Sequence, residues 1–228
     1  MFLSLLNSGE DFSFLLIVEF LAAYFISIFL CLPIHECAHG YAAYRLGDNT
    51  AKYEGRLTLN PFAHIDYYGA LSMLIIGFGW AKPVPVNMRM FKNPKSGMAI
   101  TALAGPLSNI LLAVISMLIY NIIVVIAVSI GAVGAVVTFF LKIFWMIAVI
   151  NVSLAVFNFI PVPPLDGSRI LNAFLPDRIY YKLMRYENFT GLLLLAIVYL
   201  FDRPITAMIS FVLNLLDYIT WLPFSFIV

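Results

Sequence analysis

The longest apolar stretch of the chain limits what it can fold into. Residues 98–160 contain one charged side chain, Lys142, and a stretch of that length is too long for a single membrane span. Residues 14–32 form a second apolar run, in which only Glu19 is charged. A helix of about 20 apolar residues crosses the hydrocarbon core of a bilayer. The sequence therefore predicts an all-α polytopic membrane protein, with the lipid bilayer as a partner.

The composition agrees with this prediction. Hydrophobic residues make up 63% of the 228 residues and charged residues 11%, whereas a soluble domain is about 45–50% apolar and about 25% charged. The formal net charge of +1 favours no class of partner. Because no basic patch interleaved with aromatic residues is present, we expect no nucleic-acid partner.

Glycines and a charged break divide the apolar regions. Gly131 and Gly134 are the natural breaks that split residues 98–160 into two long helices, roughly 98–130 and 135–160. Near the end, Asp202-Arg203-Pro204 separates two more apolar segments, 190–201 and 205–222, which form either a re-entrant pair or one broken hairpin.

We expect about five to six transmembrane or re-entrant helices in one domain over residues 1–228. Its segments are a helix over 14–44, an insertion over 50–97, two core helices over 98–160, a loop and short helix over 161–187, and C-terminal helices over 188–228.

Residues 50–97 have a different character, with six of the chain's 13 lysines and arginines. Tyr53–Leu59 alternates roughly as a strand does, and Val84–Asn87 resembles an extended edge segment. Between them, Tyr67–Trp80 is apolar but too short to span. We expect a small cytoplasmic-side sheet or loop insertion with a piece that dips into the membrane.

A His-Glu-x-x-His motif, His35-Glu36-Cys37-Ala38-His39, follows the first apolar run. On a helix the two histidines project from one face, one turn apart, and can bind one zinc ion. Zinc lowers the pKa of water towards about 7, and Glu36 can act as the general base. The motif predicts metalloprotease chemistry inside a membrane. The alternatives are a polar contact between helices and a proton relay, since such residues are costly in a membrane without partners.

The orientation of the chain follows from its basic loops. Lysines and arginines concentrate in 45–97 and 169–185, so the positive-inside rule predicts cytoplasmic loops there and an N-terminus outside the cell membrane. The helix over 14–44 then carries the motif towards the cytoplasmic side. Two crossings within 98–160 return the chain to that same side.

A third zinc ligand is expected from elsewhere in the chain, since a catalytic site needs three protein ligands and an open position. Asp166 is the best candidate because it follows a broken membrane helix at the same depth as the histidines. The alternative is that Asp166 caps the helix that begins near Ser168.

Two asparagines at membrane depth are further candidates. Asn109 lies early in the helix over 98–130, and Asn158 precedes a proline-rich break. Each could bind an extended substrate peptide or could form an interhelical hydrogen bond.

Three motifs together resemble the site-2 protease family of intramembrane zinc metalloproteases. They are His35–His39, Gly105-Pro106-Leu107-Ser108-Asn109, and Asn158-Phe159-Ile160-Pro161-Val162-Pro163-Pro164-Leu165-Asp166-Gly167. The resemblance covers about residues 14–175 and is that of a minimal form with no room for a PDZ domain.

The resemblance implies residue roles and a class of substrate. One zinc ion per chain would be bound by His35, His39 and Asp166, with Glu36 as the general base. Asn109 and Asn158 would support the substrate and the transition state. The substrates would be transmembrane segments of membrane-bound regulatory proteins.

The main alternative function is a metal or proton transporter that uses the same His, Glu and Asp residues as a transit site. The i, i+4 spacing of the histidines around Glu36 favours the protease, and no internal repeat is present.

Three other residues have open roles. His64 is a loop histidine or a gating ligand, and Cys31 is a small buried side chain or an additional zinc ligand. Glu19 is expected to pair with a polar group such as Asn121 or Lys142.

Overall fold

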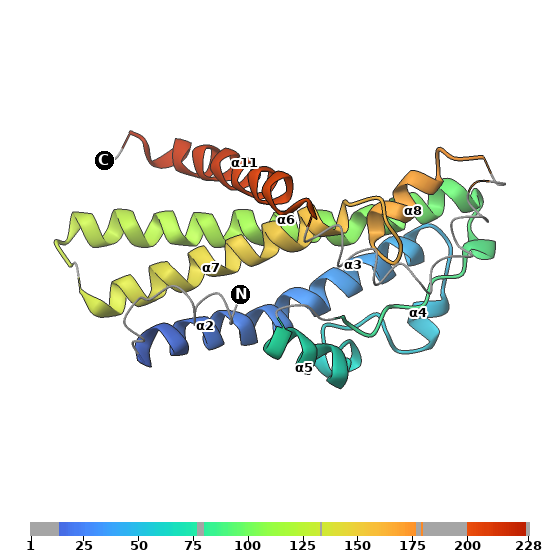
Figure 1. Cartoon of the computed structure of the whole chain (residues 1–228), viewed down its shortest axis with the longest axis horizontal. Helices are drawn as coiled ribbons and strands as arrows, with labels where there is room; N and C mark the ends of the chain where they lie inside the picture. The colour runs from blue at the N-terminus through green and yellow to red at the C-terminus, as the bar shows by residue number, and fades with distance from the viewer. Residues whose placement is uncertain (1–13, 77–79, 133, 177–178, 180–199, 227–228) are drawn as a thin grey trace.

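The computed structural model describes residues 14–76, 80–132, 134–176, 179 and 200–226. The described part is mostly helical and elongated, with the long helices running along its length (Figure 1). It contains no β-sheet, and its one isolated bridge joins Ile65 and Ala81. The all-α prediction is therefore confirmed, and the expected β insertion is not found in these residues.

The N-terminal part is one continuous helical path with a change of hydrogen bonding inside it. It consists of α2 (Phe14–Ile26), the π-helical segment η1 (Ser27–Cys31) and α3 (Leu32–Arg45). The Leu32 N–H donates to the Ser27 carbonyl five residues back. Pro33 follows at once, and because it has no N–H the regular pattern cannot continue there. The irregularity before the histidines is thus a π-helical turn.

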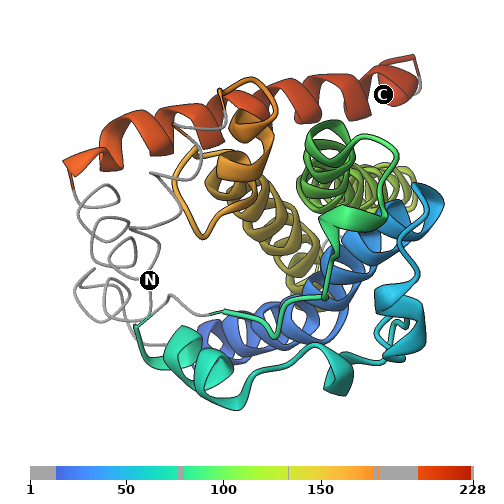
Figure 2. The same cartoon turned by 90° about the vertical axis from the view of Figure 1, so that its right-hand side faces the viewer.

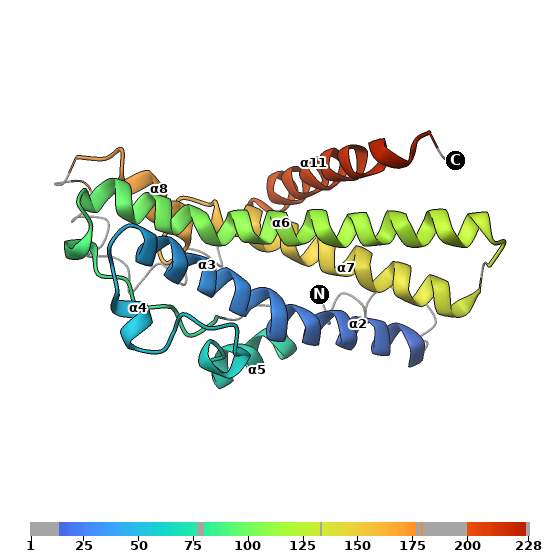
Figure 3. The same cartoon turned by 180° about the vertical axis from the view of Figure 1, so that it is seen from behind.

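The two core helices form where the glycines predicted them. They are α6 (Pro94–Ser129) and α7 (Ala135–Asn158), which run antiparallel and pack against each other along their length (Figure 3). Gly131 has a φ of 65°, a left-handed conformation that favours glycine, so the chain can reverse there. Buried small residues, including Ala113 and Ala148, allow the two helices to lie close together.

Short elements occupy the insertion and the segment that follows α7. They are α4 (Thr50–Tyr53), η2 (Pro61–Ala63), α5 (Tyr67–Ile76), η3 (Met88–Met90) and α8 (Asp166–Asn172). The strand expected over Tyr53–Leu59 is wrong. The N–H groups of Gly55 and Arg56 donate back to the carbonyls of Lys52 and Ala51, so the start of this stretch forms the end of α4 instead.

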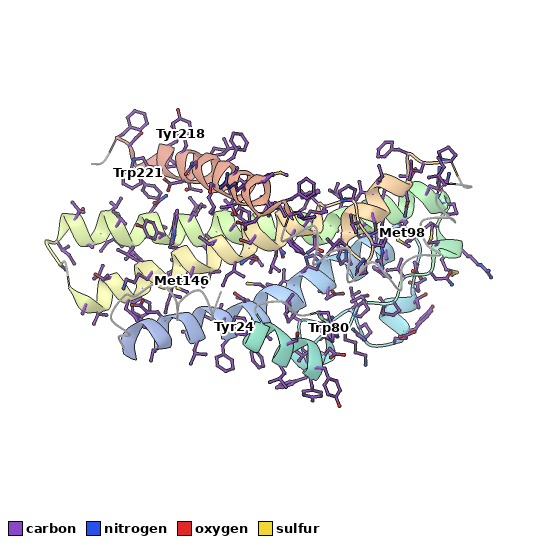
Figure 4. All side chains as sticks on the ribbon, in the orientation of Figure 1. Tyr24, Trp80, Met98, Met146, Tyr218 and Trp221 are labelled. Carbon is purple, nitrogen blue, oxygen red and sulfur yellow. The ribbon has the colours of Figure 1, made fainter. Side chains whose placement is uncertain are left out.

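The last described elements are α11 (Asp202–Trp221) and η5 (Leu222–Phe224). Leu213 and Leu216 of α11 are buried against α6 and α7, while Tyr218 lies on its outer face (Figure 4). Seen along the long axis, α11 and α5 lie on opposite sides of the described helices (Figure 2). The expected segment 190–201 lies almost wholly outside the described residues.

Three of the described helices are long and apolar enough to cross a membrane. They are α6, α7 and α11 with η5. This agrees with a multi-pass membrane protein, whereas the expected total of five to six helices is not confirmed by the described residues. The first span expected, 14–32, lies on the continuous path through α2 and η1.

The buried Glu19 has a partner on another helix. Its Oε1 lies 3.2 Å from the Nζ of Lys142, so α2 and α7 are joined by an ion pair. Lys142 is one of the two partners that the sequence suggested. The other, Asn121, donates instead to the Thr220 hydroxyl of α11 at 3.1 Å.

Candidate metal centre

Two helices bring His35, His39 and Asp166 together. The Nε2 atoms of the histidines, both on α3, are 3.0 Å apart. The Oδ2 of Asp166, in the first turn of α8, lies 3.3 Å from Nε2 of His35 and 3.2 Å from Nε2 of His39. All three residues are buried. Among the described residues, they form the one group of His, Cys, Asp or Glu with the spacing of metal ligands.

The donor set fits a zinc ion. A tetrahedral zinc with bonds of about 2.0–2.1 Å holds its ligand atoms about 3.3–3.4 Å apart, close to the three separations found here. The Oδ2 of Asp166 is buried, and no donor in the described part of the chain meets it in hydrogen-bonding geometry. A buried carboxylate oxygen of this kind needs a cation or a donor.

A backbone carbonyl orients one of the two imidazoles. The Nδ1 of His39 donates to the Thr101 carbonyl of α6 at 2.7 Å. Because a carbonyl can only accept, this hydrogen bond places the proton on Nδ1 and leaves a lone pair on Nε2 for a metal ion. This contact could not be predicted from the sequence, since any residue of α6 offers a carbonyl.

Gly105 lets α6 pass directly over the imidazoles. A Cβ atom at this position would overlap Nε2 and Cε1 of His39 and Cε1 of His35. The absence of a side chain at Gly105 thus makes room for the rings of His35 and His39, the proposed ligands.

Replacing Gly105 with alanine is expected to reduce zinc affinity about 10- to 100-fold, a range seen when groups that orient metal ligands are disturbed. The added methyl group would push α6 away from α3 or rotate the imidazoles out of the orientation in which they bind zinc. Zinc titration of the detergent-purified protein measures the change. Gly134→Ala is the matched control, because a Cβ there meets no atom within 4 Å. Equal zinc affinity in both variants would contradict the prediction.

Glu36 lies between the histidines on α3 and is partly buried. Its Oε2 accepts a hydrogen bond from the backbone N–H of Val84 at 2.9 Å. Val84 belongs to the stretch that was expected to be an extended edge segment. It forms no strand, but its backbone reaches the proposed general base.

The two candidate asparagines differ in their surroundings. Asn109 of α6 is fully buried, one turn after Gly105, and neither its side-chain oxygen nor its nitrogen has a partner in the described residues. Asn158, at the end of α7, donates to the Leu154 carbonyl one turn back at 3.0 Å. Asn109 is therefore the one with unused hydrogen-bonding capacity on both atoms.

The contacts of Asp166, Cys31 and His64 bear on the alternative roles that the sequence left open for them. Asp166 is not an N-cap, because α8 begins at Asp166 and Leu165 precedes it. Cys31 is buried and receives a hydrogen bond from Asn151 at 3.2 Å. The Nε2 of His64 donates to the Thr58 carbonyl at 2.8 Å in the loop after η2. Neither Cys31 nor His64 belongs to the metal-ligand group.

Comparisons with known proteins agree on one class of enzyme. A model of peptidase family M50 matches residues 120–200. The chain is 39% identical over 164 residues to "Putative zinc metalloprotease YwhC" of Bacillus subtilis, across 72% of this chain and 74% of the relative. It is 29% identical over 146 residues to "Putative zinc metalloprotease Rip2" of Mycolicibacterium smegmatis, across 60% of this chain and 51% of that relative. No solved structure matches the chain.

Proposed function

The chain belongs to peptidase family M50, and on that premise we propose that His35, His39 and Asp166 bind its zinc ion and that Glu36 is its general base. It is a zinc metalloprotease of the intramembrane type. The observation that carries the residue assignment is the convergence of three buried ligand atoms from α3 and α8. Neither the family nor the relatives support the transporter alternative.

The reaction is hydrolysis of a peptide bond. When bound, zinc supplies a Lewis acid that lowers the pKa of water and polarises the substrate carbonyl. Glu36 accepts the proton of the attacking water and transfers it to the leaving amine nitrogen. The Val84 hydrogen bond engages one oxygen of Glu36 and leaves the other for this proton.

Asn109 and Asn158 are the proposed contacts for the substrate. The free amide of Asn109 can donate to a substrate carbonyl and stabilise the negative charge that develops on it. One side-chain N–H of Asn158 donates to the Leu154 carbonyl. Its second N–H and its side-chain oxygen can bind the backbone of the peptide. A substrate helix must unwind before it can use either contact, since its amides are otherwise hydrogen-bonded within the helix.

The proposed substrates are transmembrane segments of membrane-bound regulatory proteins. The family implies membrane-protein substrates in a lipid environment, and the site is built on helices of a multi-pass membrane protein. The proposed orientation places the N-terminus outside and the metal centre towards the cytoplasmic side, because the basic loops lie at that end of α3.

Metal removal tests this function. Detergent-purified protein is expected to cleave a model transmembrane peptide, to lose that activity with a zinc chelator and to regain it when zinc is added. Magnesium should not restore cleavage, because it prefers oxygen ligands in octahedral geometry. Peptide cleavage followed by mass spectrometry measures the outcome. Cleavage that persists in metal-free protein would overturn the proposal.

A further inference from the structure

An extended segment next to α3 is held by charged side chains outside the metal-ligand group. We call residues 82–87 the bracing segment. Its Val84 N–H donates to Glu36 Oε2 at 2.9 Å. Its Asn87 N–H donates to Asp48 Oδ2 at 2.6 Å. Its Lys82 carbonyl accepts from Arg56 Nη2 at 2.7 Å. Three charged side chains thus bind the backbone of one short segment.

Asp48 connects this segment to the end of α3. Its backbone N–H donates to the Ala43 carbonyl at 3.0 Å, and its side chain is fully buried. The other carboxylate oxygen accepts from the N–H and the hydroxyl of Thr50 at 2.9 and 2.5 Å. Burial tends to raise the pKa of Asp48, but the hydrogen bonds from Thr50 and Asn87 hold it below its usual value. The carboxylate therefore stays ionised at neutral pH.

Together with the backbone, these hydrogen bonds form a closed loop that includes Glu36, the proposed general base. It runs from Glu36 along α3 to Asp48, across to Asn87, back along the bracing segment to Val84, and across to Glu36. Arg56 holds the far end of the segment at Lys82. The position of the Val84 N–H is therefore fixed by one contact before it, at Lys82, and one after it, at Asn87.

The sequence of the bracing segment makes Val84 a distinctive donor. Pro83 and Pro85 flank it, so Val84 has the one backbone N–H among these three residues. The Val84 side chain is buried and faces Gly40 of α3, where a Cβ would come within 3.2 Å of its Cγ1. The segment is thus docked on the helix that carries Glu36.

We propose that Asp48 is a positioning residue for the reaction, acting through the bracing segment and the Val84 N–H to orient the Glu36 carboxylate. The inference rests on the proposed role of Glu36 as general base. A general base must hold its oxygen within hydrogen-bonding reach of the attacking water. If the Glu36 side chain could change rotamer freely, its oxygen would occupy that position for a smaller fraction of the time. Asp48 touches neither the zinc ligands nor Glu36.

Val84→Pro tests the contact itself, because proline removes the N–H and suits an extended backbone. We expect kcat for the model peptide to fall roughly 10- to 100-fold, as when supporting contacts of a catalytic group are lost. KM and one bound zinc per chain should be unchanged. Val86→Pro is the matched control, since in the described structure the Val86 N–H makes no hydrogen bond; it should retain wild-type kcat.

A double-mutant cycle then tests Asp48. Asp48→Ala should lower kcat in the wild-type background and have no further effect on kcat in Val84→Pro, because both act through one hydrogen bond. Asp48→Asn, which keeps one oxygen acceptor, should recover part of the loss. Additive losses, or wild-type kcat in Val84→Pro, would overturn the proposal, and so would loss of zinc together with kcat. If wild type does not cleave, or Glu36→Gln cleaves normally, the proposed function fails instead.

Discussion

Glu36→Gln is expected to retain one zinc ion per chain and to lose peptide cleavage by about 10²- to 10⁴-fold, the usual contribution of a general base. Glutamine is the same size, and its side-chain oxygen can still accept the Val84 N–H that Glu36 Oε2 accepts at 2.9 Å. It cannot take a proton from water at neutral pH. Zinc content and cleavage of the model peptide, measured on the same sample, separate the two effects.

Glu54→Gln is the matched control for that variant. Glu54 is exposed at the end of α4 and contacts neither the zinc ligands nor Glu36, so the same chemical change should leave the cleavage rate unaltered. A Glu36→Gln protein that cleaves at the wild-type rate would remove Glu36 from the mechanism. A variant that loses zinc as well would indicate that Glu36 contributes to metal binding.

Asp166→Ala is expected to lower zinc affinity by more than about 100-fold, since disturbing even a supporting residue of a metal site costs about 10- to 100-fold. The carboxylate lies within 3.3 Å of both imidazole Nε2 atoms and has no other donor in the described residues. Cleavage should be lost with the metal. Zinc titration and peptide cleavage measure the two losses.

Asp202→Ala provides the control for Asp166→Ala. Asp202 also lies in the first turn of a helix, α11, but is exposed and outside the metal-ligand group. It should bind zinc as the wild type does. If Asp166→Ala retained wild-type zinc affinity, Asp166 would be a helix-terminal residue and the third ligand would have to come from elsewhere.

The metal centre depends on helix packing as much as on its ligands. His35 and His39 lie on one helix, but His39 is oriented by Thr101 of α6 and both rings fit under Gly105. α6 also packs against α8, which supplies Asp166. Movement of α6 would therefore disturb all three proposed ligands, which is why Gly105→Ala is informative without changing a ligand.

The helices could be predicted from the sequence because their signals are local. The long apolar run and its glycines placed the core helices at 98–130 and 135–160, and the structure has them at Pro94–Ser129 and Ala135–Asn158. The i, i+4 spacing put both histidines on one helical face. Asp166 was suggested by the return of the chain to the same side after two crossings, and the structure brings it to the histidines.

Local pattern was misleading within the insertion. Tyr53–Leu59 alternates as a strand does, but a strand needs a neighbour to pair with, and none of the described residues forms a sheet with it. The N–H groups of Gly55 and Arg56 instead donate back to the carbonyls of Lys52 and Ala51, at the end of the short helix α4. The φ of 66° at Gly55 is left-handed and cannot belong to an extended strand.

By itself the sequence determined the membrane class, the core helices and the identity of the candidate ligands, because hydrophobic periodicity and motif spacing depend on neighbouring residues. Only the tertiary structure decided which backbone groups orient those side chains. The Thr101 carbonyl meets His39 and the Val84 N–H meets Glu36 through packing between distant segments. Nearly every residue carries these same backbone groups, so no residue type in the sequence marks the ones that are used.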